Sequence, residues 1–175
     1  MGQSKQFIFT NLDIDGSLSY LLLKWVTGQE IPYKCSSIFN IEKDFSDWYR
    51  ANGEKYERIY ILGIDVSECM NVINKDNVVV FAHKLPVKEL SNAKIVTDEN
   101  ASTSMLIYKK FAEKVNLTES QKLLIVIADD IKKHTFDLPY SRELDMLYRA
   151  STGDRLMKFC IDFKPGFKGF LQEER

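Results

Sequence analysis

The feature that most constrains this fold is an alternation of short apolar runs with segments of helical period. The runs of strand length are QFIFT (6–10), KCSSIF (34–39), RIYILGID (58–65), NVVVFAHK (77–84) and AKIVTD (93–98). Strands separated by helices pair in parallel, because each crossover carries the chain back to the starting edge of the sheet. The sequence therefore predicts an α/β fold, Rossmann-like, with a mostly parallel sheet flanked by helices.

The helical segments fill the intervals between these runs and dominate the second half of the chain. They are SLSYLLLKWVTG (17–28), IEKDFSDWYRANG (41–53), ASTSMLIYKKFAEKV (101–115), TESQKLLIVIADDIKKH (118–134) and SRELDMLYRASTGDRLMKF (141–159). Thr118 and Gln121 have the spacing of a capping box. No repeat or linker divides the chain, so we expect a single domain over residues 1–163 and a C-terminal tail over residues 164–175.

Composition narrows the classes of partner. The 175 residues are 45% apolar, enough to bury one substantial core. The net charge of -1 provides no global cationic field, so a polyanionic ligand must be met by local groups. Three cysteines lack the spacing of a disulfide framework or a zinc cage, and no apolar stretch approaches the roughly 20 residues of a membrane span. We expect a cytoplasmic protein with no membrane partner.

Polar residues follow the expected strands where each one ends. They are Asp13 and Asp15 after the first strand, Asp65 after the third and His83 after the fourth. The carboxyl ends of parallel strands share one edge of the sheet, where ligands of such folds bind. Together with Asp129 or Asp130, these residues would form an oxygen-rich site with one imidazole. That donor set suits Mn²⁺ or Mg²⁺, and up to two ions sharing a carboxylate could activate water for phosphoryl chemistry.

Each residue also has an interpretation without a ligand. Asp13 and Asp15 could form a plain turn before a helix, and His83 could be an ordinary hydrogen-bonded histidine. Asp129 and Asp130 could form the solvated end of a helix. Ser102, Thr103 and Ser104 could hold phosphate oxygens at a helix start, or they could only cap that helix.

Several stretches resemble the motifs of the DHH phosphoesterase superfamily, in order, over roughly residues 7 to 150. TNLDIDGSLS resembles the first motif, which is commonly T-H-x-D-L-D-G-x-x-S, and ILGIDVS resembles the second, an Asp that closes a strand. FAHK occupies the place of the third motif, usually D-H-H. ASTSMLIYKKF is similar to the A-S-T-S/A-x-L-I-Y helix of the family, and DDIKKH followed by SRELDMLY resembles the segment that holds the fourth-motif Asp.

The resemblance implies a role for each matching residue. Asp13 would bind one ion, Asp15 and His83 the other, and Asp65 would bridge the two. Asp130 would complete the second ion, because aligning His134 with a common downstream His places Asp130, rather than Asp129, at the ligand position. The implied ligand set is Asn11, Asp13, Asp15, Asp65, His83 and Asp130, and the implied substrate contacts are Lys84, Ser102, Thr103, Ser104 and His134.

The sequence departs from the family pattern at three places. Asn11 replaces the usual first-motif His, which leaves the first ion without an imidazole. In the third motif, Ala82 replaces Asp and Lys84 replaces the second His, although Lys84 could bind phosphate as a point charge. The glycine-rich C-terminal substrate-binding domain of the family has no counterpart in these residues. The sequence leaves open whether another chain supplies such a domain and whether the protein is a homo-oligomer.

The resemblance thus predicts an enzyme, a Mn²⁺- or Mg²⁺-dependent phosphoesterase or phosphodiesterase. It would hydrolyse a nucleotide or a short single-stranded oligonucleotide by attack of a metal-bound hydroxide. One alternative is a catalytically degenerate module that only binds a nucleotide or a protein partner. Another is a haloacid-dehalogenase-like phosphatase, in which Asp13 is the nucleophile, Asp15 the general acid/base, and Asp129 and Asp130 hold Mg²⁺.

Overall fold

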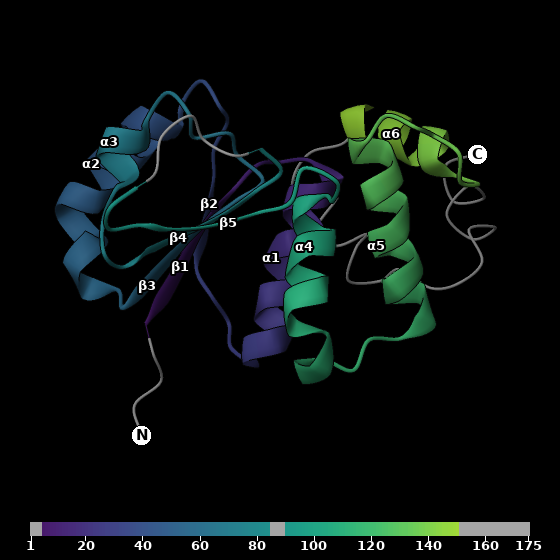
Figure 1. The fold of residues 1–175 in the computed structure, drawn as a ribbon, viewed down its shortest axis with the longest axis horizontal. Coiled ribbons are helices and arrows are strands. Elements are labelled where there is room, and N and C mark those ends of the chain that lie inside the picture. Colours follow the sequence, from purple (N-terminus) through teal and green to yellow (C-terminus); the bar gives the residue numbers. More distant parts are fainter. Residues whose placement is uncertain (1–4, 85–89, 151–175) are drawn as a thin grey trace.

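A five-stranded parallel sheet forms the centre of the molecule in the computed structural model, which describes residues 5–84 and 90–150 (Figure 1). The strands are β1 (Gln6–Thr10), β2 (Tyr33–Cys35), β3 (Arg58–Leu62), β4 (Val78–Ala82) and β5 (Lys94–Thr97), in the spatial order β2-β1-β3-β4-β5. Every neighbouring pair is parallel. The predicted α/β class with a mostly parallel sheet is confirmed.

Helices cover both faces of this sheet. They are α1 (Ile14–Thr27), α2 (Ile41–Asn52), α3 (Met70–Ile73), α4 (Thr103–Phe111), α5 (Glu119–Lys132) and α6 (Ser141–Ala150), with short 3-10 turns at Gly53–Lys55 and Ala112–Lys114. The helices α2 and α3 lie on one side of the sheet, and α1, α4 and α5 lie on the other (Figure 1). None of the helices within the described residues has the length and apolarity that crossing a membrane requires.

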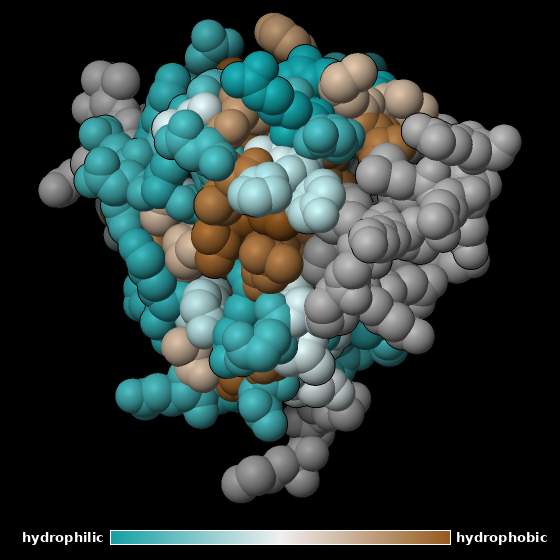
Figure 2. Space-filling model, turned by 90° about the vertical axis from the view of Figure 1, so that its right-hand side faces the viewer, coloured by the Kyte–Doolittle hydropathy of each residue, from teal (hydrophilic) through white to brown (hydrophobic). Residues whose placement is uncertain are grey.

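The strand side chains alternate between two cores, as the two-residue period of a strand requires. Phe7 and Phe9 pack with Phe45 of α2 in one core, whereas Ile8 packs with Leu18 of α1 in the other. Because both faces of the sheet are covered, β4 is apolar and buried at every position. On the α5 and α6 side of the molecule, apolar side chains also reach the surface (Figure 2), and α5 exposes Leu123 and Val126.

Most expected elements form close to their predicted positions. Gly28 ends α1 with a φ of 64°, a left-handed conformation that favours glycine, and Thr118 forms the expected capping box with Gln121. The second strand is shorter than predicted: it ends at Cys35, because the next residues turn and Asn40 donates its backbone N–H to the carbonyl of Ser37. The helix expected at 141–159 begins at Ser141, and its second half, like the expected tail at 164–175, lies outside the described residues.

Candidate functional site

A cavity of about 670 Å³ opens at the carboxyl ends of β1, β3 and β4. Its charged and histidine lining residues are Asp13, Asp15, Asp65, His83, Lys84, Lys132, His134, Asp145 and Arg149. The structure therefore brings the four strand-end residues of the sequence analysis to one cavity, together with Lys84 and His134. The lining contains both acidic and basic side chains, so it can bind a cation through the former and a phosphate group through the latter.

Asp13 caps the first helix. Its Oδ1 accepts the backbone N–H of Gly16 at 2.7 Å, the usual arrangement for an N-cap carboxylate. Its Oδ2 accepts the Asn11 side-chain amide at 2.5 Å and lies 3.4 Å from Lys132 Nζ. Both oxygens of Asp13 are thus already engaged by protein groups.

Asp15 joins α1 to α4. Its side chain is almost completely buried, and its two oxygens accept the backbone N–H groups of Thr103 at 3.0 Å and Ser104 at 2.7 Å, at the start of α4. Burial raises the pKa of Asp15, and the neighbouring Asp13 raises it further. The partial positive charge of the α4 N-terminus offsets part of this penalty.

A glycine is required directly after the two carboxylates, where α1 packs against the end of β1. A Cβ at Gly16 would lie 2.0 Å from Asn11 Oδ1 and 2.4 Å from the Asn11 carbonyl oxygen, which no side chain can tolerate. Asn11 Oδ1 is buried, faces Gly16 and Gly63, and has no hydrogen-bond partner within the described part of the chain. The predicted ligand Asn11 therefore presents its amide N–H to Asp13 and keeps its oxygen packed against the glycines.

Asp65 lies in the loop after β3 and keeps one oxygen free. Its Oδ1 accepts both the backbone N–H of Ser67 at 3.0 Å and the Ser67 hydroxyl at 2.6 Å. These hydrogen bonds lower the pKa of Asp65, so the carboxylate is ionised at neutral pH. Its Oδ2 has no hydrogen-bond partner among residues 5–84 and 90–150.

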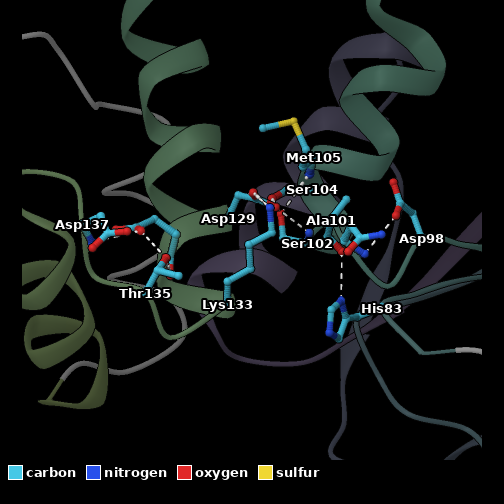
Figure 3. Close-up of polar contacts among 12 residues, drawn as sticks. His83, Asp98, Ala101, Ser102, Ser104, Met105, Asp129, Lys133, Thr135 and Asp137 are labelled. Atoms are coloured by element: carbon cyan, nitrogen blue, oxygen red, sulfur yellow. Dashed lines mark hydrogen bonds and ion pairs between the residues drawn. The ribbon is translucent and has the colours of Figure 1, made fainter.

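His83 follows β4, the strand next to β3 in the sheet. Its Nδ1 lies 3.1 Å from the carbonyl oxygen of Ala101. Figure 3 draws this contact as a dashed line. Because a carbonyl oxygen only accepts, Nδ1 is the donor in this contact, and in the neutral imidazole the lone pair is then on Nε2. A histidine held in this way is suited to bind a metal ion or accept a proton through Nε2.

Lys132, at the end of α5, lies beside the carboxylate pair, with its Nζ 3.4 Å from Asp13 Oδ2. Burial lowers the pKa of Lys132, but the Asp13 and Asp15 carboxylates outweigh it, so the pKa lies above its usual value. The side chain is 29% exposed and lines the cavity. It therefore stays protonated beside the two carboxylates.

Asp130 serves the turn between α5 and α6. Its oxygens accept the hydroxyls of Thr135 and Ser141 and the backbone N–H groups of Asp137 and Leu138, the latter two at 3.1 Å each (Figure 3 draws the Thr135 and Asp137 side). Burial raises the pKa of Asp130, but these hydrogen bonds outweigh it and lower the pKa to about 2. Asp130 is absent from the residues described as lining the cavity, so the structure does not bring this predicted ligand to the other four.

The backbone N–H groups at the start of α4 are also engaged. Asp129 accepts the backbone N–H of Ser102 at 2.6 Å and pairs with Lys133, as seen in Figure 3. Ser102 caps α4 through the N–H of Met105, while the N–H groups of Thr103 and Ser104 bind Asp15. Ser102, Thr103 and Ser104 are buried, and none of the three lines the cavity. The capping interpretation describes them, and they offer no free N–H group to a phosphate here.

The described residues do not fit a two-ion centre. Across residues 5–84 and 90–150, no group of three or more His, Cys, Asp or Glu side chains could hold a metal ion. On the β1 side, all four oxygens of Asp13 and Asp15 accept protein hydrogen bonds, and Lys132 lies beside them. Asp65 and His83 do have the chemistry of metal ligands. Within the described residues, each keeps one acceptor atom without a partner, a carboxylate oxygen and an imidazole nitrogen, and the two residues follow neighbouring strands.

Sequence reasoning missed Lys132 and Arg149 as cavity residues. Helical spacing carries a signal for the first of these: Ala128, Ile131 and Lys132 lie three and four residues apart, so they share one face of α5, and all three line the cavity. Asp129 and Lys133 share another face and pair with each other. No comparable signal exists for Arg149, because the direction of α6 depends on the turn that precedes it.

Comparisons with known proteins support the fold. No family model matches the chain, and no curated protein matches its sequence. Among solved structures, an uncharacterized protein from Helicobacter pylori G27 aligns with a TM-score of 0.64 at 11% identity, over 91% of this chain and 56% of that chain. Exonuclease RecJ bound to manganese aligns with a TM-score of 0.52 at 9% identity, over 89% and 56%.

A third solved structure, CDC45 from Entamoeba histolytica, aligns with a TM-score of 0.45 at 14% identity, over 84% of this chain and 34% of that chain. This chain spans a little over half the length of the first two structures. At such identities the likeness is one of fold. The protein is therefore an α/β domain whose fold resembles those of the uncharacterized Helicobacter pylori protein and of exonuclease RecJ.

Proposed function

We propose that the cavity binds a phosphate group of a nucleotide or of a short single-stranded oligonucleotide and hydrolyses the phosphoester. The observation that carries this proposal is a pair of acceptors, Asp65 Oδ2 and His83 Nε2, that have no hydrogen-bond partner among the described residues and lie at neighbouring strand ends in one cavity. The fold likeness supports the same chemical class, because an exonuclease cleaves phosphodiester bonds.

Asp65 and His83 would together hold one divalent ion, Mn²⁺ or Mg²⁺. Such ions are commonly bound by one or two protein side chains, with phosphate oxygens and water completing the coordination. The ion would neutralise charge on the phosphate and lower the pKa of a bound water. The protein's part is to hold both ligands ready: Ser67 keeps Asp65 ionised, and the carbonyl of Ala101 fixes the His83 tautomer.

Cations in the cavity lining would bind the rest of the phosphate charge. Lys84 directly follows His83, and Arg149 reaches the cavity from α6. A guanidinium can bind two phosphate oxygens at once, whereas an ammonium acts as a point charge. These groups supply the local positive field that the chain's net charge does not.

The nucleoside part of the ligand has a candidate surface beside the cavity. Ile38 lines the cavity from the loop before α2, and the next residue, Phe39, has a side chain that is 92% exposed. An exposed aromatic ring offers a stacking surface to any base, at about 1–3 kcal/mol per base. This favours nucleotides over inorganic phosphates such as polyphosphate as the ligand.

A binding module without activity is the second candidate, and the lack of a three-ligand metal group in the described residues favours it. The haloacid-dehalogenase-like alternative has no such support, since neither Asp129 nor Asp130 is among the residues that line the cavity.

An activity and binding screen separates hydrolysis from binding. The purified chain is incubated with mononucleotides, dinucleotides and short single strands of RNA and DNA, over a Mn²⁺ titration and with a chelator. We expect metal-dependent release of mononucleotide or phosphate that Asp65→Asn abolishes, while Asp47→Asn, at an exposed position of α2 outside the cavity lining, retains it. Ligand binding without turnover at saturating Mn²⁺ would identify the binding module, and neither binding nor turnover would reject both functions.

A further inference from the structure

The carboxylate pair at the end of β1 has an unusual environment for residues of a proposed metal site. Asp13 and Asp15 place two carboxyl groups side by side, yet each of their four oxygens accepts a hydrogen bond from the protein. The donors are the Asn11 amide and three backbone N–H groups at the starts of α1 and α4. Lys132 Nζ adds a full positive charge 3.4 Å from Asp13 Oδ2.

We infer that the Lys132 ammonium takes the place of a metal ion at the Asp13–Asp15 pair, so that this side of the cavity works without a divalent cation. Only the β1 side of the cavity is involved, and its lack of an ion goes beyond the proposed function, in which Asp65 and His83 hold one ion. Lys132 thus limits the number of ions that the site takes.

The balance of charges around the pair supports an ammonium in place of a metal ion. A helix N-terminus acts as roughly half a positive charge, and the pair lies at two of them, those of α1 and α4. Together with the ammonium, these offset about two negative charges. A divalent cation added to this arrangement would find no uncompensated carboxylate and would lie close to an ammonium of like charge.

The geometry of Asn11 supports it as well. A side-chain amide can bind a hard cation only through its oxygen, but Asn11 Oδ1 is buried against Gly16 and Gly63. The nitrogen faces Asp13 instead, as it would in a site that needs hydrogen-bond donors around a carboxylate. Lys132 and Asn11 therefore both present donors where a metal centre would present acceptors.

Counting bound Mn²⁺ tests the inference. Free Mn²⁺ is measured by electron paramagnetic resonance in titrations of the full chain as wild type, as Lys132→Met, and as Lys133→Met. Lys133 is a matched control, because it carries the same charge one residue further along and pairs with Asp129. We expect Lys132→Met to bind one more Mn²⁺ than wild type. The affinity of this added ion for the Asp13–Asp15 pair should be at least tenfold higher than that of any Mn²⁺ that Lys133→Met binds there.

A further substitution assigns the added ion. Adding Asp13→Asn to Lys132→Met should remove the gained Mn²⁺ and the rise in melting temperature that Mn²⁺ gives the single variant. Folded Lys132→Met, checked by circular dichroism, that binds no more Mn²⁺ than wild type overturns the inference. Lys132→Gln repeats the measurement should the Met variant not fold.

Wild-type protein alone provides an independent test. Two bound Mn²⁺ per chain, one of them lost in Asp13→Asn, would show that an ion displaces Lys132 and would overturn the inference. The outcome for the proposed function is separate: wild type that binds no Mn²⁺, with Lys132→Met binding one at Asp13, contradicts the Asp65–His83 ion and supports the role of Lys132.

Discussion

The two sides of the cavity use similar residues for different purposes. On the β1 side, the oxygens of Asp13 and Asp15 are all occupied by donors from α1, α4 and Asn11. On the β3 and β4 side, Asp65 and His83 each keep one acceptor free within the described residues. Carboxylates that follow a strand can therefore serve to hold helix N-termini in place. The side of the cavity that is able to bind a ligand is the one whose acceptor atoms have no protein partner among the described residues.

The largest expected effect is on folding. Asp15→Ala leaves two N–H groups of α4 buried and unpaired, and each such group costs about 1–3 kcal/mol. We expect the free energy of unfolding, measured with urea, to fall by about 3 kcal/mol. Asp65→Ala loses only contacts with Ser67 in a partly exposed loop, so we expect a loss of about 1 kcal/mol. Equal losses at both positions would break the comparison.

The next effect is on metal binding. Here substitutions at Asp65 and His83 should have a larger effect than one on the β1 side. Asp65→Asn removes a ligand charge and His83→Gln removes the imidazole, so each should weaken Mn²⁺ binding, measured by titration calorimetry with inorganic phosphate present, by at least about tenfold. Asp13→Asn should change this affinity by less than about threefold, because the pair is neutralised by the protein. A larger loss in Asp13→Asn than in Asp65→Asn would place the ion on the wrong side of the cavity for our proposal.

A third comparison uses acid. The pKa of Asp130 is lowered to about 2, so its stabilising contribution is complete above its ordinary value of 3.8 and is lost as the pH falls toward 2. The pKa of Asp15 is raised, so its charge opposes folding at neutral pH and its protonation relieves that cost as the pH falls toward 3.8. We expect the difference in unfolding free energy between wild type and Asp130→Asn to shrink between about pH 5 and pH 2.

For Asp15→Asn, we expect the stability relative to wild type to change with pH in the opposite direction. An amide does not titrate, so this variant lacks the relief that wild type gains on acidification, and its stability relative to wild type should fall as the pH decreases toward 3.8. Parallel curves for wild type, Asp130→Asn and Asp15→Asn would show that neither carboxylate has a shifted pKa.

Much of this architecture follows from local sequence, and the exceptions share one cause. The apolar runs and the cap at Thr118 depend on neighbouring residues, and parallel strands bring Asp13, Asp65 and His83 to one edge whatever the helices do. The use of each carboxylate depends instead on distant segments. Asp15 binds Ser104, 89 residues away, and Lys132 reaches Asp13 across 119 residues.

Asp130 illustrates the same limit more closely in sequence. Its position matched the fourth motif, but the chain turns back after α5, with His134 and Phe136 at positive φ, and this turn wraps the carboxylate in four donors. A motif records spacing along the chain. It does not record which way a turn closes, so the sequence could not distinguish a cavity ligand from a residue that holds a turn.

The smallest expected effect concerns the surface beside the cavity. Phe39 is 92% exposed, so Phe39→Ala should leave the unfolding free energy unchanged within about 0.5 kcal/mol. If a base stacks on this ring, the variant should bind a short single strand about fivefold more weakly, the lower end of the stacking range, while its affinity for inorganic phosphate stays the same. Leu123→Ala, an exposed apolar residue on α5, is the matched control and should change neither affinity. Fluorescence anisotropy of a labelled oligonucleotide measures both variants, and equal affinities for Phe39→Ala and wild type would restrict recognition to the phosphate, making the β3 and β4 side of the cavity the whole of the ligand site.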